Sequence, residues 1–317
     1  MGFFIVLGML AACANLPQTA AILDRLPTDI PKYVELQHVP FFPQEDYQCG
    51  PASLATILSA SGIKIEPDAL VSQVYIPSKK GSLQIEMVAA IRRYGRIAYE
   101  LKPELIDILK EVNAGRPVLV LENYNAGFSQ TWHYAVVVGY DLNREEFISR
   151  SGVKRRETLS FNQFEYLWKQ GGYWGVVALP LEELPATVNE NRFEQSVLSL
   201  EQSGHHNHAK KAYQTLLSRW PKNLVGQIGL GNTSYALGDL ESAKLAFMQA
   251  IHNHPETAMA YNNLAHVFAD LGQMAEAIKT AEKAISLGGP LLEEANATLT
   301  EIKLKAESLK LHRNKKK

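Results

Sequence analysis

A repeat with a period of 34 residues occupies the C-terminal part of this 317-residue chain. The same residue types return at that interval, with glycine at Gly204, Gly238 and Gly272, alanine at Ala209, Ala243 and Ala277, and proline at Pro221 and Pro255. Recurrence at one period over three copies predicts an array of like units, in which each unit packs on the next.

This pattern resembles the tetratricopeptide repeat, in which a small residue lets two helices cross closely, glycine ends the first helix and proline ends the second. The resemblance implies a stack of helix pairs. The middle copy carries it at Leu230, Gly231, Gly238, Ala243, Phe247, Ala250 and Pro255. We expect three units over residues 192–288 and a polar capping helix over 290–312; a generic helical bundle is the alternative. Arrays of this kind have no chemistry of their own and bind extended peptides or partner proteins on a concave face, so we expect a protein partner here.

The rest of the chain divides by composition. Residues 1–13 are predicted to be a signal segment, 14–36 a tether, 37–180 a domain of mixed helix and strand, 181–191 a polar linker and 192–317 the repeats with their capping helix. The formal net charge is −1, so no bulk electrostatic field attracts nucleic acid, and we expect no nucleic-acid partner. Two cysteines are too few for a disulfide scaffold or a four-thiolate zinc site.

The first cysteine follows an apolar segment. Residues 3–12 are uncharged, and Leu10-Ala11-Ala12-Cys13 resembles the bacterial lipobox, in which the cysteine is acylated and becomes the new N-terminus. The resemblance implies an exported protein held at the membrane by lipid on Cys13, and Ala14 after the cysteine implies the outer membrane, facing the periplasm. No Lys or Arg precedes the apolar run, and a buried N-terminal helix with a chance cysteine is the alternative.

The second cysteine stands where a helix is predicted to begin. In Gln48-Cys49-Gly50-Pro51 the proline fits the first turn of a helix, and Leu54, Ile57 and Leu58 form its apolar stripe. The unpaired N–H groups and positive dipole of a helix start lower the pKa of a thiol, which predicts a reactive Cys49. A small buried thiol with no chemical role is the alternative.

A cysteine nucleophile needs a base, and His133 is our candidate. It begins the run Trp132-His133-Tyr134-Ala135-Val136-Val137-Val138, which is typical of a strand buried on both faces. A histidine at the end of such a strand lies at the sheet edge, where a helix start can face it. A satisfied core histidine is the alternative.

Gln44, Cys49-Gly50-Pro51 and His133-Tyr134, followed by Gly139-Tyr140-Asp141, together resemble the C39 family of cysteine peptidases over residues 37–180. The resemblance implies an α+β papain-like protease domain, here followed by an all-α tetratricopeptide-repeat solenoid. It also implies that Gln44 helps to form the oxyanion hole with the Cys49 backbone N–H, Gln48 being a second candidate.

The third catalytic residue of that family, an Asp on the strand returning after the histidine, is missing. The corresponding stretch is Phe147-Ile148-Ser149-Arg150-Ser151-Gly152. Ser149 and Ser151 share a strand face by alternation, and a serine hydroxyl can accept a hydrogen bond from an imidazole. We predict that Ser149 orients His133, with Ser151 as the alternative.

Other patterns predict little. His205, His206 and His208 cluster without a fourth ligand, so we expect no metal, and no phosphate-binding GxxxxGK[ST] motif or other cofactor motif occurs. The favoured function is hydrolysis of peptide bonds in a peptide or protein substrate. The alternatives are a non-catalytic envelope scaffold and a thiol acyltransferase or amidase on the same fold.

Overall fold

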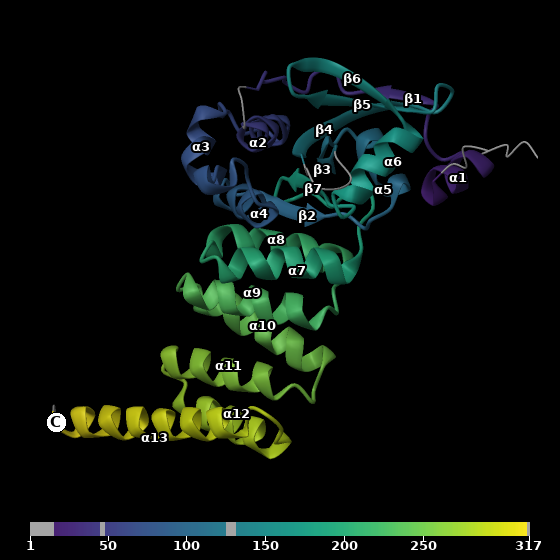
Figure 1. Cartoon of the computed structure of the whole chain (residues 1–317). Coiled ribbons are helices and arrows are strands. Elements are labelled where there is room, and N and C mark those ends of the chain that lie inside the picture. Colours follow the sequence, from purple (N-terminus) through teal and green to yellow (C-terminus); the bar gives the residue numbers. More distant parts are fainter. Residues whose placement is uncertain (1–15, 45–47, 125–130, 316–317) are drawn as a thin grey trace, which may run out of the picture. The chain divides into compact units, whose positions relative to one another are not determined.

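The computed structural model describes residues 16–44, 48–124 and 131–315. Its contacts divide the chain into two compact units (Figure 1). The first unit comprises residues 1–87 and 101–177, and the second comprises residues 88–100 and 178–317. Residues 88–100 fall inside the predicted mixed domain, yet most of their contacts are with the second unit, because Tyr99 packs against Phe193 and its hydroxyl donates to the Thr187 carbonyl.

One antiparallel sheet organises the mixed domain. Its strands are β1 (Tyr33–Glu35), β2 (Ile97–Glu100), β3 (Val118–Asn123), β4 (Trp132–Asp141), β5 (Glu146–Ser151), β6 (Lys154–Ser160) and β7 (Gly175–Leu179), in the order β2-β7-β3-β4-β5-β6 with β1 paired to β4. The central strand β4 has no solvent-exposed residue from Tyr134 to Tyr140, as its apolar run predicts. A bulge shifts the β4–β5 register between Val137 and Gly139.

Helices cover both sides of this sheet. They are α1 (Pro17–Asp24), α2 (Cys49–Ala60), α3 (Asp68–Val74), the 3₁₀ turn η1 (Pro77–Lys79), α4 (Gln84–Arg93), α5 (Leu105–Asn113) and α6 (Phe161–Gln170). Helix α2 packs against β4 and β3 on one side, and α5 and α6 lie on the other (Figure 1). The predicted α2 begins at Cys49 and ends before Gly62, whose φ of +93° suits glycine.

Residues 16–36 are not the free tether that we predicted. Thr19 and Ile22 of α1 are buried, and the Glu165 carboxylate accepts backbone hydrogen bonds from Gln18 and Thr19 at 3.1 and 2.7 Å. Strand β1 adds Tyr33–Glu35 to the edge of β4. This segment is therefore part of the first unit, held by a carboxylate at a helix start.

The repeats form as predicted. The helices are α7 (Glu190–Gln202), α8 (His206–Arg219), α9 (Leu224–Ala236), α10 (Leu240–Asn253), α11 (Ala258–Asp270), α12 (Met274–Leu287) and α13 (Leu292–Lys315). The first helices of the three pairs begin at Glu190, Leu224 and Ala258, each 34 residues after the last. Helix α7 thus begins two residues before the predicted boundary at 192, and α13 is the predicted capping helix.

Candidate functional site

Cys49 is the first residue of α2, beside the start of β4. Its thiol is within hydrogen-bonding reach of the backbone N–H groups of Tyr134, Gly50 and Cys49 itself. The Ser53 hydroxyl, one turn along the helix, donates to the Tyr134 carbonyl at 3.0 Å and ties α2 to β4. Since Tyr134 follows His133 directly, the fold brings the two predicted catalytic residues to the same end of the sheet.

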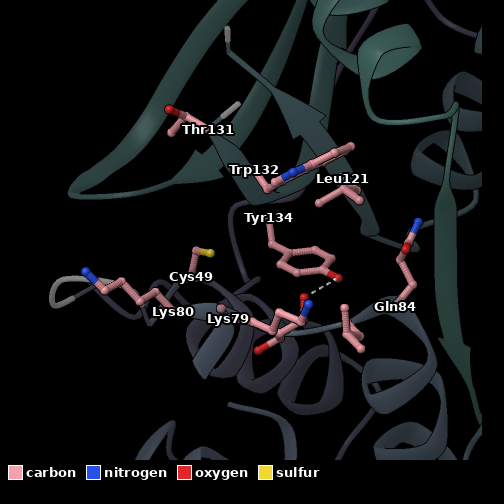
Figure 2. A pocket seen from close by; sticks show the side chains of 11 residues that line it. Cys49, Lys79, Lys80, Gln84, Leu121, Thr131, Trp132 and Tyr134 are labelled. Atoms are coloured by element: carbon pink, nitrogen blue, oxygen red, sulfur yellow. Dashed lines mark hydrogen bonds between the residues drawn. The ribbon is translucent and has the colours of Figure 1, made fainter. Parts of the chain in front are cut away.

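The glycine after the cysteine is required by close packing. A Cβ atom at Gly50 would lie 2.1 Å from Ser82 Oγ and 2.6 Å from Ser82 Cβ. The Tyr134 hydroxyl donates to the Ser82 carbonyl at 3.2 Å, so the segment before α4 is fixed to β4 as well as to α2 (Figure 2). Gly50 therefore lets this segment lie beside the thiol.

A pocket of about 630 Å³ opens next to Cys49. Its lining comes from η1 and the residues that follow it, and from β3 and β4: Lys79, Lys80, Gly81, Ser82, Leu83, Gln84, Leu121, Thr131, Trp132 and Tyr134, together with Cys49. The Tyr134 ring lies in the middle of this pocket, between Cys49 and Gln84 (Figure 2). A half-exposed Trp132 and the exposed Lys79 and Lys80 give it an aromatic and basic rim.

The imidazole of His133 is held from the neighbouring strand. Its Nε2 lies 3.0 Å from Ser151 Oγ, at the end of β5. The Tyr124 ring meets it edge-on, with ring centroids 5.6 Å apart. One ring nitrogen is thus occupied by Ser151, which leaves Nδ1 as the nitrogen that can serve a thiol.

The serine at the imidazole is Ser151 and not Ser149, our first choice. Ser149 is buried on β5 opposite Val137, four residues along β4 from His133. In the β4–β5 pair Arg150 stands opposite Val136, so Ser151, one residue further along β5, lies nearer to His133 than Ser149 does. Alternation gives the face of a strand but not its register.

Burial governs the ionisation of both groups. It raises the pKa of the Cys49 thiol, although the three backbone N–H groups lower it; the low pKa that we predicted from the helix start is therefore wrong. Burial also lowers the pKa of His133, against the charge of Glu157, which raises it. The resting pair is consequently a neutral thiol and a neutral imidazole, the state in which His133 can accept a proton.

Gln44 and Cys13 are the two predicted site residues that remain. The Gln44 backbone N–H donates to the Gly152 carbonyl at 3.2 Å, which places Gln44 next to the turn after Ser151. Cys13 lies outside the described residues. In the described part of the chain no helix is long and apolar enough to span a bilayer, and no group of three or more His, Cys, Asp or Glu side chains could hold a metal ion.

Two residues near His133 escaped the sequence analysis. Glu157 on β6 hydrogen-bonds to Ser151, and Tyr124, directly after β3, touches both His133 and Ser151. Glu157 stands in a strand of mostly charged and polar residues, and Tyr124 stands where a loop begins. Neither context indicates a functional site in the sequence. Only the pairing of β5 with β6 brings Glu157 close.

Comparison with known proteins finds family models that match two stretches of the chain. Residues 36–176 match the model of the Peptidase_C39 like family, and residues 228–290 match a tetratricopeptide repeat model. A solved structure of a C39-like peptidase from Bacillus anthracis is similar at 21% identity and a TM-score of 0.40, covering 47% of this chain and 98% of that one. The Yersinia enterocolitica type III secretion chaperone SycD, solved with a peptide of the translocator YopD, is 22% identical, with a TM-score of 0.35 over 37% of this chain and 93% of its own.

Among curated proteins, the Hsp70-Hsp90 organising protein of Plasmodium falciparum is 41% identical over 58 residues. That match covers 18% of this chain and only 23% of the Plasmodium protein. The chain thus carries a C39-like peptidase domain over residues 36–176 and tetratricopeptide repeats over residues 228–290.

Proposed function

We propose that this protein is a cysteine peptidase that hydrolyses peptide bonds through Cys49 and His133. The observation that carries the proposal is the placement of the two groups: Nε2 of His133 is held by Ser151, and the Cys49 thiol touches the N–H of the next residue, Tyr134. A nucleophile with a neighbouring base whose far nitrogen is held by a third group is the arrangement that acyl transfer needs.

In the proposed reaction, Cys49 Sγ attacks the carbonyl carbon of a peptide bound in the pocket, and His133 takes the thiol proton. The backbone N–H of Cys49 and the Gln44 amide stabilise the oxyanion. The C–N bond then breaks, and the imidazolium returns its proton to the leaving amine. Water attacks the thioester with His133 as base, which releases the acid and restores the thiol.

The repeats supply no group to this chemistry, and we propose that they recruit the substrate or a partner protein. Tetratricopeptide repeats bind peptide or protein partners. We also propose that the protein is exported and held at the outer membrane by lipid on Cys13, because the apolar residues 3–12 end directly at that cysteine.

Labelling by a peptidyl vinyl sulfone tests the peptidase proposal. In a Cys13→Ser background, where Cys49 is the sole thiol, intact mass spectrometry is expected to show one adduct, located on Cys49 by peptide mapping. His133→Gln is expected to slow this labelling roughly a hundredfold, since the proton acceptor is lost. Cys49→Ala is the matched negative control.

Two outcomes would favour the alternatives. If Cys49 reacts with iodoacetamide but not with the peptidyl probe, the domain is a scaffold on a protease fold. If an acyl-enzyme forms but is consumed by added amines and not by water, the protein is an acyltransferase.

Anchoring is tested separately by Cys13→Ser. The variant is expected to move from the membrane fraction to the soluble fraction and to lose incorporation of labelled palmitate, because an acyl chain contributes about 0.8 kcal/mol of membrane affinity per buried CH₂. Cys49→Ser, the change at the other cysteine, is the control and should stay at the membrane. Unchanged fractionation of Cys13→Ser, with no acyl mass on the mature N-terminus, contradicts the anchor.

A further inference from the structure

Besides His133, the hydroxyl of Ser151 has two neighbours, Tyr124 and Glu157. Ser151 ends β5, and Glu157 lies on the paired strand β6, where it stands opposite Ser149. Its carboxylate hydrogen-bonds to Ser151, so it lies one hydroxyl away from the imidazole. The Glu157 side chain is 14% exposed, and its other partner is Lys154 Nζ at 2.7 Å.

A second carboxylate, Glu122 on β3, stands opposite His133 across the β3–β4 pair. Glu122 is fully buried, accepts a hydrogen bond from the Tyr124 hydroxyl at 2.9 Å, and has a pKa raised by burial to about 7. Burial also raises the pKa of Glu157, but the hydrogen bonds to Lys154 and Ser151 and the charge of Lys154 outweigh burial, so this pKa is lowered. At neutral pH Glu157 is therefore the carboxylate that is fully charged.

We propose that Glu157 positions His133 through the Ser151 hydroxyl, in the place of the Asp that the C39 pattern puts directly on the histidine. Glu157 touches neither substrate nor thiol, so it is a positioning residue, and the inference rests on the proposed peptidase function.

The direction of the two hydrogen bonds explains why the carboxylate matters. A serine hydroxyl alone can donate to or accept from an imidazole nitrogen, so it fixes no tautomer. A carboxylate only accepts, so Ser151 donates its single hydroxyl proton in the hydrogen bond to Glu157. The Tyr124 oxygen, whose own proton goes to Glu122, is the other acceptor near this hydroxyl, and a proton donated to either one points away from His133. The Ser151 oxygen can then only accept from His133, which puts the imidazole proton on Nε2 and leaves the Nδ1 lone pair for the thiol of Cys49.

The charge of Glu157 also acts electrostatically on the imidazole of His133. It raises the pKa of His133, so it stabilises the imidazolium that forms when the thiol proton is transferred. Among the described residues, the other titratable groups near His133 are Glu122 on β3, Tyr124 directly after β3 and Lys154 on β6, and the Cys49 thiol lies at the N–H of the next residue, Tyr134.

The test measures the His133 ring without any substrate. Full-length protein labelled with ¹⁵N histidine is titrated by NMR, and the His133 signals are identified by their loss in His133→Gln. The wild type is expected to show the Nε2-protonated tautomer. Glu157→Gln is expected to show a mixture of tautomers and a lower His133 pKa, because an amide can donate as well as accept. Iodoacetamide alkylation of Cys49 in the Cys13→Ser background should slow about tenfold, the equivalent of one pKa unit.

Glu146→Gln is the matched control. Glu146 lies on the adjacent strand β5, its side chain is 19% exposed, and it pairs with Arg144 at 3.9 Å, much as Glu157 pairs with Lys154. This variant should leave the tautomer and the alkylation rate unchanged. Ser151→Ala removes the hydroxyl itself and should give the same mixture of tautomers and the same slower alkylation as Glu157→Gln. The double variant should show no larger effect than either single variant.

A wild-type tautomer and His133 pKa in Glu157→Gln would overturn the proposal, as would equal effects of Glu157→Gln and Glu146→Gln. If Glu157→Gln does not fold, Ser151→Ala decides by the same signals. If the protein shows the predicted tautomer but does not react with the vinyl sulfone, the positioning role of Glu157 stands and the peptidase function is refuted. The two failures are therefore distinguishable.

Discussion

Replacing Ala243 by Arg is expected to unfold the helical repeats while the first unit keeps its fold. Ala243 is fully buried where α10 crosses its neighbours, in a cluster with Phe247 and Leu264. This cluster is apolar, so an arginine side chain must either displace the neighbouring helix or bury its charge. The cost is on the order of 3 kcal/mol or more. Because each repeat depends on its neighbours, the loss is expected to spread along the array.

Circular dichroism at 222 nm measures the helical loss, and tryptophan fluorescence in a Trp220→Phe background follows the first unit, which holds Trp132, Trp168 and Trp174. Leu245→Arg is the matched control, on the same helix and 64% exposed, and should change stability by no more than about 0.5 kcal/mol. If Ala243→Arg retained full helical content and an unchanged melting curve, close packing at the repeated alanine would not hold the array together.

The repeats were predictable because their signals are local and recur. Gly204, Gly238 and Gly272 all adopt positive φ, between +75° and +78°, after the first helix of each pair. At such a turn any residue with a Cβ is strained, so the glycine is visible in the sequence as a fixed position. Ala277 repeats the same buried helix crossing as Ala243, 34 residues later.

Half of the candidate site was predictable for the same reason. Gly50-Pro51 indicates where α2 begins, and the apolar run after His133 indicates a buried strand, so each residue could be placed at an end of its own element. Whether Cys49 and His133 come to the same end of the sheet, however, depends on how α2 packs against β4, which no local pattern specifies. Here the family resemblance supplied what periodicity could not.

The residues behind His133 depend on strand register and were missed or misordered. The β4–β5 register puts Ser149 opposite Val137 and leaves Ser151, at the end of β5, as the neighbour of the imidazole. Glu157 comes close only because β6 folds back on β5, and the sequence of β6 resembles any solvated strand. The thiol pKa was predicted in the wrong direction because burial, a property of the whole fold, outweighs the helix start.

Replacing Glu122 by Gln is expected to stabilise the first unit at alkaline pH. Glu122 is fully buried, and its Oε1 atom has no hydrogen-bond partner among the described residues. Burial raises its pKa to about 7, above the value of about 4.3 for an unfolded chain. A group with a raised folded pKa contributes its stability fully below the unfolded value and loses it as the pH rises through the folded value. The wild type therefore loses about 3 kcal/mol from this residue between roughly pH 4.5 and 8.

Glutamine is uncharged over that whole range, so the difference between variant and wild type isolates this one ionisation. At pH 4.5 the two proteins should have similar free energies of unfolding, and at pH 8 the variant should be the more stable by up to about 3 kcal/mol. Urea unfolding in the Trp220→Phe background, followed by tryptophan fluorescence at both pH values, gives the comparison. Glu146→Gln, at the partly exposed start of β5, is the control and should show no such gain. If the gain of Glu122→Gln were the same at pH 4.5 and pH 8, Glu122 would not be ionising inside the fold, and the carboxylate next to His133 in the β3–β4 pair would stay neutral throughout.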